Sequence, residues 1–284
     1  MSKQLTELPI GMIKNFVSEN FENVNYTKPA LQFFDDVFLG DIEDNAKLDE
    51  FKKLIDVKAD KPHIIKEWLK NNYNIDLELD GDYAIAAVLE LILEFKRKAT
   101  SSIIKIKDVN YEAGRHNNCV AFYYKDTKNF NKNRVFKLDL VNDDYEMYVS
   151  EMKLDPSIFN KNSLFEEKLG ISENSDVILP LVNYKDENDY TASFKGSTMI
   201  KKDNGVSYEI ESMNTITLLN LGLEKVEVKQ AAVMVIGVSG CVGSFKPLPL
   251  RIIKDDFYIY IKYKGSLIFG SSMVRADFLE SEEL

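Results

Sequence analysis

The segment that most restricts the fold of this chain runs from Val226 to Val238 (VEVKQAAVMVIGV). Its first half alternates apolar and charged residues, whereas its later half has almost no polar residue. A strand with so few polar residues has to be covered on both faces. The segment therefore predicts a strand that is buried within a sheet.

Other segments after residue 100 also have β character. Arg134 to Leu140 and Tyr145 to Ser150 flank the turn-forming residues 141–144, and Phe257 to Tyr263 and Ser266 to Phe269 flank Lys264-Gly265. Both arrangements predict β-hairpins. We also expect a short helix over Leu164 to Leu169 and a further strand over Asp176 to Tyr184.

The first 80 residues are predicted to be mostly helical. Helical spacing connects Leu48, Phe51, Leu54 and Ile55, and it returns in Ile64, Ile65, Trp68 and Leu69 after Pro62, which suits a first helical turn. Two runs differ. Leu31 to Leu39 (LQFFDDVFL) is interpreted as a buried strand, and Tyr83 to Phe95 fits a buried strand or a buried helix equally well. Helices early and strands late indicate an α+β fold, and the lack of a linker indicates one domain over residues 1–284.

Charge and cysteine content limit the partners and the compartment. The net charge is −10, and the longest basic run, Lys96 to Lys98, is too short to follow a phosphate backbone. We therefore expect no nucleic-acid partner, and the same sign of charge disfavours anionic membrane surfaces. With no apolar run of signal-peptide or membrane-span length, and with Cys119 and Cys241 unpaired, the expected location is cytoplasmic.

Candidate catalytic residues are few. His63 and His116 are the only histidines, neither has metal-ligand spacing, and two cysteines cannot complete a zinc site, so we expect no metal and no cofactor. The acid pairs Asp143-Asp144 and Glu166-Glu167 are typical of solvated turns and faces. We therefore expect no catalytic residue and no enzymatic activity.

A small-residue segment after the buried run could be mistaken for a catalytic or phosphate-binding loop. In Gly237-Val238-Ser239-Gly240-Cys241-Val242-Gly243 the last glycine of a nucleophile elbow is replaced by Cys241. Pro247 and Pro249 follow, so no helix begins there whose dipole could bind a phosphate. The sequence shows no neighbouring His and no helix end that would lower the pKa of Cys241. The segment is best interpreted as a flexible connection.

The order of the segments resembles the serpins, the serine protease inhibitor family. His63 to Ile75 is similar to the family's helix I-N-x-W-V followed by T-x-G-x-I, and Val177 to Tyr190 is similar to its Leu-Pro-Lys-Phe stretch with the following Tyr-Asp-Leu. In the C-terminal hairpin, Asp255-Asp256-Phe257 corresponds to His-Pro-Phe and Ile268-Phe269-Gly270 to Leu-Phe-Gly. The remaining similar stretches are Asp82 to Phe95, Phe130 to Val149, Val226 to Ile236 and Ile253 to Gly270.

The resemblance implies a serpin-like fold with N-terminal helices and large mixed or antiparallel sheets in the C-terminal two-thirds. It also implies that Val226 to Ile236 leads into the reactive loop, and that the chain is shortened among its N-terminal helices. In an inhibitory serpin the cleaved loop inserts as a new central strand and carries the protease with it. The family's hinge, Glu-Glu-Gly-Thr followed by alanines, is absent, and Gly237 to Ser244 stands in its place.

The remnant of the reactive loop is expected to be short. It comprises Gly237, Val238, Ser239, Gly240, Cys241, Val242, Gly243, Ser244, Phe245 and Lys246, because Pro247 to Phe257 is assigned to the strand that leads to the C-terminal hairpin. Fully extended, such a segment reaches at most ~33 Å. We expect that loop-insertion inhibition is lost.

Three functions remain open at this point. The first is a non-inhibitory serpin-like protein that binds another protein, of the shortened type by which a virus or parasite engages a host protein. The second is a protease inhibitor that acts through residues 237–251, by occlusion or by a residual serpin mechanism, with Lys246 or Arg251 as the bait side chain. The third is an unrelated α+β enzyme.

Overall fold

The computed structural model describes residues 5–39, 42, 44–125, 134–159, 162–171, 174–235 and 253–281. Its helices are α1 (Leu8–Asn20), α2 (Lys28–Asp36), α3 (Asn45–Phe51), α4 (Pro62–Tyr73), α5 (Asn162–Lys168) and α6 (Thr191–Phe194), with 3-10 turns at Pro156–Phe159 and Arg275–Asp277. No helix in these ranges is long and apolar enough to cross a membrane. Four of the six helices precede residue 74, which confirms the predicted helical N-terminal region.

The described strands form three antiparallel sheets. The central sheet has the order β10 (Val182–Asp189), β13 (Ser212–Leu221), β14 (Lys225–Val235), β3 (Ala84–Glu94) and β2 (Ile55–Asp60). A larger sheet has the order β16 (Ser266–Met273), β15 (Phe257–Tyr263), β7 (Tyr145–Ser150), β6 (Arg134–Leu138), β5 (Val109–Tyr124) and β4 (Thr100–Ile106), and β8 (Leu169–Ile171) and β9 (Ser175–Pro180) pair with β5. The third contains β1 (Phe21–Asn25), β11 (Thr198–Lys201) and β12 (Ser207–Glu209). The α+β prediction is confirmed.

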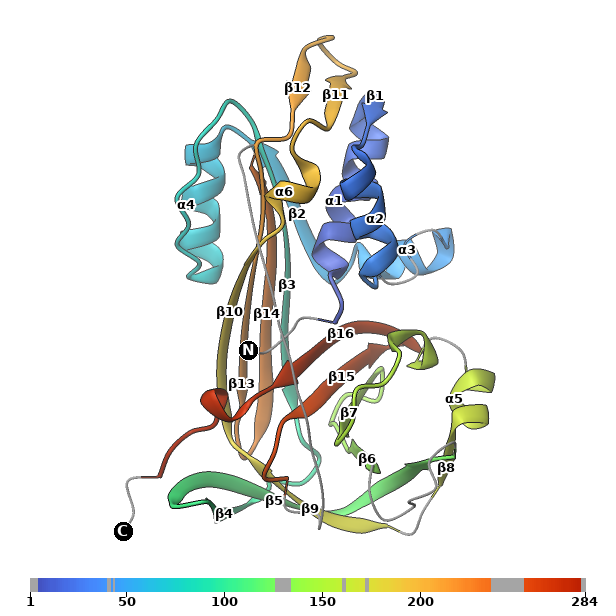
Figure 1. The fold of residues 1–284 in the computed structure, drawn as a ribbon, viewed down its shortest axis with the longest axis vertical. Coiled ribbons are helices and arrows are strands. Elements are labelled where there is room, and N and C mark those ends of the chain that lie inside the picture. The colour runs from blue at the N-terminus through green and yellow to red at the C-terminus, as the bar shows by residue number, and fades with distance from the viewer. Residues whose placement is uncertain are drawn as a thin grey trace.

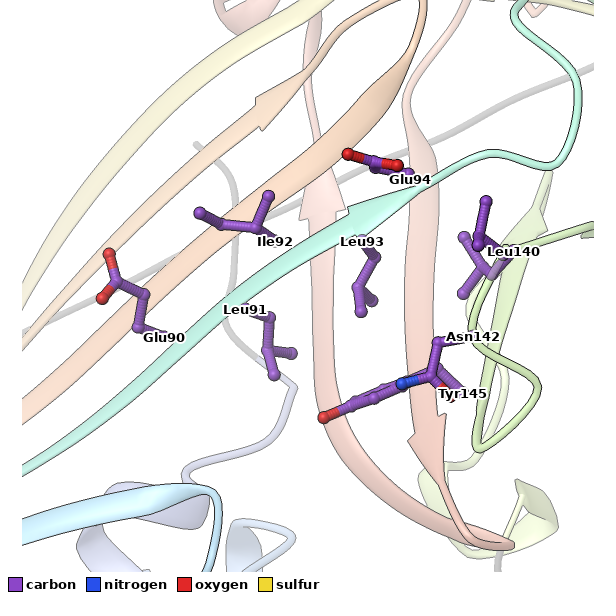
Figure 2. A pocket seen from close by; sticks show the side chains of 9 residues that line it. Glu90, Leu91, Ile92, Leu93, Glu94, Leu140, Asn142 and Tyr145 are labelled. Carbon is purple, nitrogen blue, oxygen red and sulfur yellow. The ribbon is translucent and has the colours of Figure 1, made fainter.

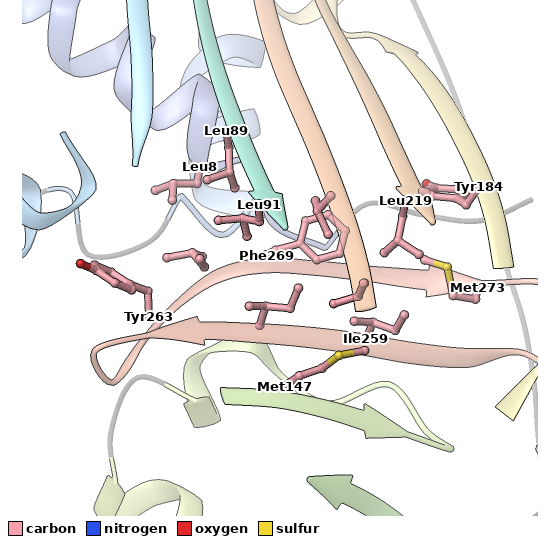
Figure 3. Close-up of a cluster of buried hydrophobic side chains, with 14 of the residues drawn as sticks. Leu8, Leu89, Leu91, Met147, Tyr184, Leu219, Ile259, Tyr263, Phe269 and Met273 are labelled. Atoms are coloured by element: carbon pink, nitrogen blue, oxygen red, sulfur yellow. The ribbon is translucent and has the colours of Figure 1, made fainter. Parts of the chain in front are cut away.

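Helices cover both faces of the central sheet at one end, and the larger sheet crosses it at the other (Figure 1). The buried side chains of α1 pack on the face formed by Leu89 and Leu91 of β3 together with Val228 and Ala232 of β14. The opposite face packs against α4. At the crossing, Leu91 and Leu219 meet side chains of β15 and β16 such as Ile259 and Phe269 (Figure 3).

Helix α4 packs on a part of the central sheet that contains several alanines. Ile65, Leu69 and Tyr73 of α4 pack on a surface made mostly of small side chains. Those side chains are Ala84, Ala86 and Val88 of β3 and Ala231 and Val233 of β14. Because alternate residues of a strand point to opposite faces, these residues of β3 and β14 face α4, while the residues between them, such as Leu89 and Val228, face the core under α1.

Several predicted elements are confirmed. Residues 134–138 and 145–150 pair as β6 and β7, and Phe257–Tyr263 pairs with Ser266–Met273 as β15 and β16. Lys264 and Gly265 both have positive φ at the tip of the second hairpin, as a tight hairpin turn requires. Helix α5 confirms the short helix predicted over Leu164 to Leu169, and the ambiguous run Tyr83 to Phe95 forms strand β3.

Three predictions of local structure need correction. Leu31 to Leu39 is not a strand, because residues 31–36 belong to α2, in which Ala30 and Phe33 occupy one buried face at helical spacing. The helical pattern of Leu48 and Phe51 ends at Phe51, and Ile55 begins β2. The strand predicted over Asp176 to Tyr184 is two strands, β9 and β10, which are separated at Leu181 and lie in different sheets.

Strand β14 provides the first test of this architecture. Val228 is fully buried between β13 and β3, and replacing it with Asp would place an unpaired charge among apolar side chains. We expect Val228→Asp to lower the free energy of unfolding by several kcal/mol, to be measured by urea denaturation. The matched control is Asp143→Lys in the β6–β7 turn, whose side chain is 85% exposed, and it should change stability by less than ~0.5 kcal/mol. Equal stability of the Val228→Asp protein and the native protein would show that β14 is not a core strand.

Candidate functional site

The candidate site is the centre of the central sheet, where β14 lies. β14 pairs antiparallel with β13 from Val226 to Val235 and antiparallel with β3 from Lys225 to Met234. Its two neighbours therefore run parallel to each other. β14 therefore occupies an interior position of the antiparallel sheet, between β13 and β3.

The connection that leads into β14 is short. β13 ends at Leu221 and β14 begins at Lys225, and the N–H group of Gly222 donates to the carbonyl oxygen of Lys225 at 3.0 Å. The assignment of Val226 to Ile236 as the strand that leads into the reactive loop stays a prediction, because residue 236 and the loop lie outside the described residues. Strand β13, which we did not predict, precedes this hairpin, and β14 follows it. The buried, sheet-embedded character predicted for the segment is confirmed for the described residues up to Met234.

The side chains of β14 suit this position on both faces. Val226, Val228, Gln230, Ala232 and Met234 are buried on the face that packs under α1. On the other face the charged residues come first and the small ones last. Lys229 there forms an ion pair with Glu90 of β3 at 2.7 Å and donates to the carbonyl oxygen of Tyr73 at 3.3 Å.

A buried polar cluster lies in the middle of the inserted strand. The Nε2 atom of Gln230 donates to the carbonyl oxygen of Thr6 at 3.0 Å and contacts Oε2 of Glu7 at 3.4 Å. The hydroxyl group of Tyr190 donates to Oε1 of Glu7 at 2.8 Å. The cluster therefore joins β14 to the segment before α1 and to the residue that follows β10.

Burial controls the ionisation of Glu7. Removal from water raises its pKa to about 8; the hydrogen bond from Tyr190 opposes this shift, and the charge of Asp186 adds to it. A protonated Glu7 places no charge in this buried site, and its two oxygens still accept from Tyr190 and Gln230. Oε1 of Gln230 has no hydrogen-bond partner in the described structure. Oγ1 of Thr217 on the neighbouring β13, whose register partner is Gln230, is likewise buried without a partner.

The structure separates the two histidines and gives neither a catalytic setting. His63 is exposed near the start of α4. His116 is buried on β5 with its ring against Phe95, 4.9 Å between centroids, and burial lowers its pKa to about 4, so that it is neutral at physiological pH. Within the described ranges, no three His, Cys, Asp or Glu residues gather as a metal site.

The remaining candidates are surface groups, a buried thiol or residues outside the described structure. Asp143 pairs with Lys96 in an exposed ion pair at 2.6 Å. Cys119 is a buried free thiol whose pKa is raised to about 12 by burial, which keeps it protonated. The predicted loop remnant, Gly237 to Lys246, and the bait candidates Lys246 and Arg251 lie outside the described residues, as does residue 241 with the second thiol. Of Pro247 to Phe257, the described residues before Phe257 are not in a strand, although Ile253 donates to Ile178 at 2.9 Å.

Comparisons with known proteins agree with this geometry. No family model and no curated protein matches the sequence. Among solved structures, the fold is similar to the thermophilic serpin tengpin in the latent state, with a TM-score of 0.65 at 10% identity over 96% of this chain and 92% of that chain. It is also similar to cleaved serpin 42Da, with a TM-score of 0.55 at 11% identity over 78% of this chain and 66% of that one.

A third similar structure is a cleaved, loop-inserted ovalbumin mutant, with a TM-score of 0.52 at 12% identity over 75% of this chain and 62% of that chain. This chain thus spans about two thirds of the length of the serpin 42Da and ovalbumin chains. At these identities the similarities concern the fold. The chain has a divergent serpin-like fold, as the resemblance predicted.

The buried Glu7 predicts a pH dependence of stability. Its folded pKa of about 8 exceeds the ordinary value of 4.5, so the folded state binds the proton more tightly than the unfolded state does. The stabilisation is complete below about pH 4.5 and is lost as the pH rises toward 8, by up to about 1.4 kcal/mol per pH unit. We expect Glu7→Gln to reduce the fall in unfolding free energy between pH 5 and pH 8.

The matched control for this measurement is Glu22→Gln, which changes an exposed glutamate on β1. Glu151 should retain its own contribution in both variants, because burial also raises its pKa to about 8. An identical pH profile for Glu7→Gln and the native chain would contradict the buried, protonated state of Glu7.

Proposed function

We propose that this chain is a non-inhibitory serpin-like protein that acts by binding another protein. The observation that supports the proposal is the position of β14, which fills the centre of the sheet and is paired on both sides. A trap driven by loop insertion needs that place to be vacant until the protease cleaves. A sheet that already holds its inserted strand has no such step left.

The energetics of β14 favour this interpretation. Withdrawing it would expose Val226, Val228 and Met234, and each apolar side chain of this size contributes about 1.5–3 kcal/mol when buried. Its pairing with β13 is also local in sequence, with only Gly222 to Glu224 between the strands. Such hairpins form within about 1–10 μs, so β14 can pair with β13 before the distant strand β3 arrives. Both its stability and its route of folding favour the inserted state.

A second candidate is the protease inhibitor that acts through residues 237–251, with Lys246 or Arg251 as bait. One observation favours it: the sheet accepts a strand at the place where a cleaved reactive loop would insert. The expectation that Gly237 to Lys246 is too short to insert stays a prediction, because these residues lie outside the described structure. If β14 is itself the inserted strand, the loop is counted from Lys225, and its length does not exclude an inhibitor. The occupied sheet is the reason that we prefer the non-inhibitory function.

The proposal includes no enzymatic activity and no cofactor. We further propose that residues 1–284 are one domain, that the protein is cytoplasmic and that it belongs to the shortened type of serpin-like protein that engages a host protein. The buried free thiol of Cys119 is compatible with a reducing compartment. The unrelated enzyme is disfavoured by the serpin-like fold.

Cleavage within residues 237–246 tests the proposal. Because β14 already fills the sheet, a cut there should leave the melting temperature unchanged or lower, measured by circular dichroism on intact and nicked protein with the cut mapped by mass spectrometry. In parallel, incubation with trypsin-like and chymotrypsin-like proteases should give no complex that survives denaturing electrophoresis. A rise of tens of degrees after nicking, or such a complex, would establish the inhibitor instead.

A further inference from the structure

Strand β2 forms one outer edge of the central sheet. It pairs with β3 from Ile55 to Asp60, and no strand or bridge of the described chain pairs with its other side. Farther along, the same side of β3 is closed. The N–H group of Val141 donates to the carbonyl oxygen of Glu94 at 2.9 Å there, and residues of these two segments line a pocket of about 310 Å³ (Figure 2). On this side of the sheet, β2 is therefore the described strand whose edge is open.

The hydrogen bonds of β3 show which of its backbone groups face β2. The N–H group of Phe95 donates to the carbonyl oxygen of Glu224 at 2.8 Å, on the side of β14, whereas the carbonyl oxygen of Glu94 faces the other side. Successive residues of a strand direct their backbone groups to alternate sides. The even-numbered residues of β3 therefore direct their N–H and C=O groups toward β2.

The register between β2 and β3 then fixes the backbone groups that point outward. Residues 56, 58 and 60 of β2 lie opposite even-numbered residues of β3, so their N–H and C=O groups bond to β3. The N–H and C=O groups of Ile55, Val57 and Ala59 point away from the sheet, and none of them has a hydrogen-bond partner within the described ranges. Such a row of unpaired groups is a template for pairing with another chain.

The edge of β2 is accessible. Asp56 is exposed, and Val57, Lys58 and Ala59 are half-buried. Helices α1 and α4 contact β2 from the two faces of the sheet. The outward backbone groups lie between these faces, where another strand can reach them.

Two opposite charges stand beside the outward groups, on the face that carries α4. Asp56 accepts a hydrogen bond from the hydroxyl group of Tyr73, and Nζ of Lys58 lies 5.8 Å from the ring centroid of Trp68. Within the part of the chain that the structure describes, neither Asp56 nor Lys58 forms an ion pair. A carboxylate accepts several hydrogen bonds, so Asp56 can bind a cation in addition to Tyr73. Both charges are available to a partner strand.

A second copy of β2 fits this edge in one register. If two copies pair antiparallel with Val57 opposite Val57, Ile55 lies opposite Ala59, and each Asp56 lies opposite a Lys58. The two neighbouring registers that keep outward groups opposite each other place Asp56 opposite Asp56 or Lys58 opposite Lys58. Like charges directly opposite across strands are destabilising. The sequence of β2 is therefore complementary to itself when it is centred on Val57.

The other outer strand of the central sheet lacks this property. A symmetric antiparallel pairing places its central residue opposite the same residue of the second copy. In the middle of β10 that residue is Lys185, Asp186 or Glu187, so each of these registers opposes like charges. Of the two outer strands, β2 is the one that suits a second copy.

We propose that this chain forms a two-fold symmetric dimer through β2, in which the central sheets of two copies join into one continuous sheet. Val57 exchanges backbone hydrogen bonds with Val57 of the second copy, and Ile55 does so with Ala59. Asp56 of each copy pairs with Lys58 of the other. The two-fold axis at Val57 places the α3 helices, which precede β2, at opposite ends of the pair. The dimer uses neither β14 nor residues 237–251, so the proposal is independent of the function proposed above.

Sedimentation velocity of the full chain at low ionic strength tests the dimer. We expect a concentration-dependent equilibrium between monomer and dimer. Asp56→Lys and Lys58→Asp should each weaken dimerisation at least ten-fold, because both symmetric charge pairs then become repulsive. An equimolar mixture of the two variants should form a mixed dimer, since each copy then faces the opposite charges.

Backbone changes and a matched control locate the interface. Val57→Pro removes an N–H group that only the dimer uses, so it should abolish dimerisation, while melting curves verify that every variant folds. Lys185→Asp on the outer strand β10 is the matched charge control and should leave dimerisation unchanged. In native hydrogen exchange, dimerisation should protect the amides of Ile55, Val57 and Ala59. The amides of residues 56 and 58, which bond to β3, should exchange equally slowly in both forms.

Three outcomes would overturn the proposal. The first is a chain that stays monomeric up to millimolar concentration. The second is a dimer that neither Asp56→Lys nor Lys58→Asp weakens, or two folded variants that fail to associate when mixed. The third is an assembly that grows beyond the dimer and is lost with Lys185→Asp, which would show that β2 pairs with β10 of the next copy instead.

Discussion

The rest of the structure depends on one constraint, the pairing of β14 with two strands that run in the same direction. β13 and β3 are held at the spacing of one intervening strand, and β14 satisfies both ladders over its length. The helices on the two faces depend on the same strand, because α4 packs on Ala231 and Val233 while α1 packs on the face of Val228 and Ala232. Removing β14 would therefore weaken both layers of helices as well as the sheet.

The buried polar cluster shows that this position is specified as well as stable. A core strand made only of apolar residues could slip by two residues at little cost to its pattern. Gln230 prevents such a shift, since its amide nitrogen reaches the carbonyl oxygen of Thr6 in one register only. Glu7 and Tyr190 extend the cluster to segments far away in the sequence. The cluster contains a carboxyl that burial keeps protonated, so we expect stability to fall as the pH rises from about 4.5 toward 8.

The successes and the failures of prediction from the sequence have physical explanations. Val226 to Val238 was predicted as a buried strand because a strand that is buried on both faces contains few polar residues, and the prediction is confirmed up to Met234. Its place in the sheet was not predicted, because that depends on a partner, β3, that lies over 100 residues earlier. β13 was overlooked although Gly222 marks the turn after it. Leu31 to Leu39 was misassigned because its two apolar ends hid the helical spacing of Ala30 and Phe33. Two assignments stay predictions: the loop remnant, Gly237 to Lys246, and Arg251 as a bait residue.

β14 also fixes the part of β3 that extends beyond its pairing with β2. β2 pairs with β3 only as far as Leu89, so the pairing with β14 is the one complete ladder of β3. Glu90 is held by Lys229 from β14, and Glu94 lies opposite Lys225. A β3 strand that lost β14 would therefore lose its one complete ladder, and Leu91 and Leu93 would lose neighbours in the core.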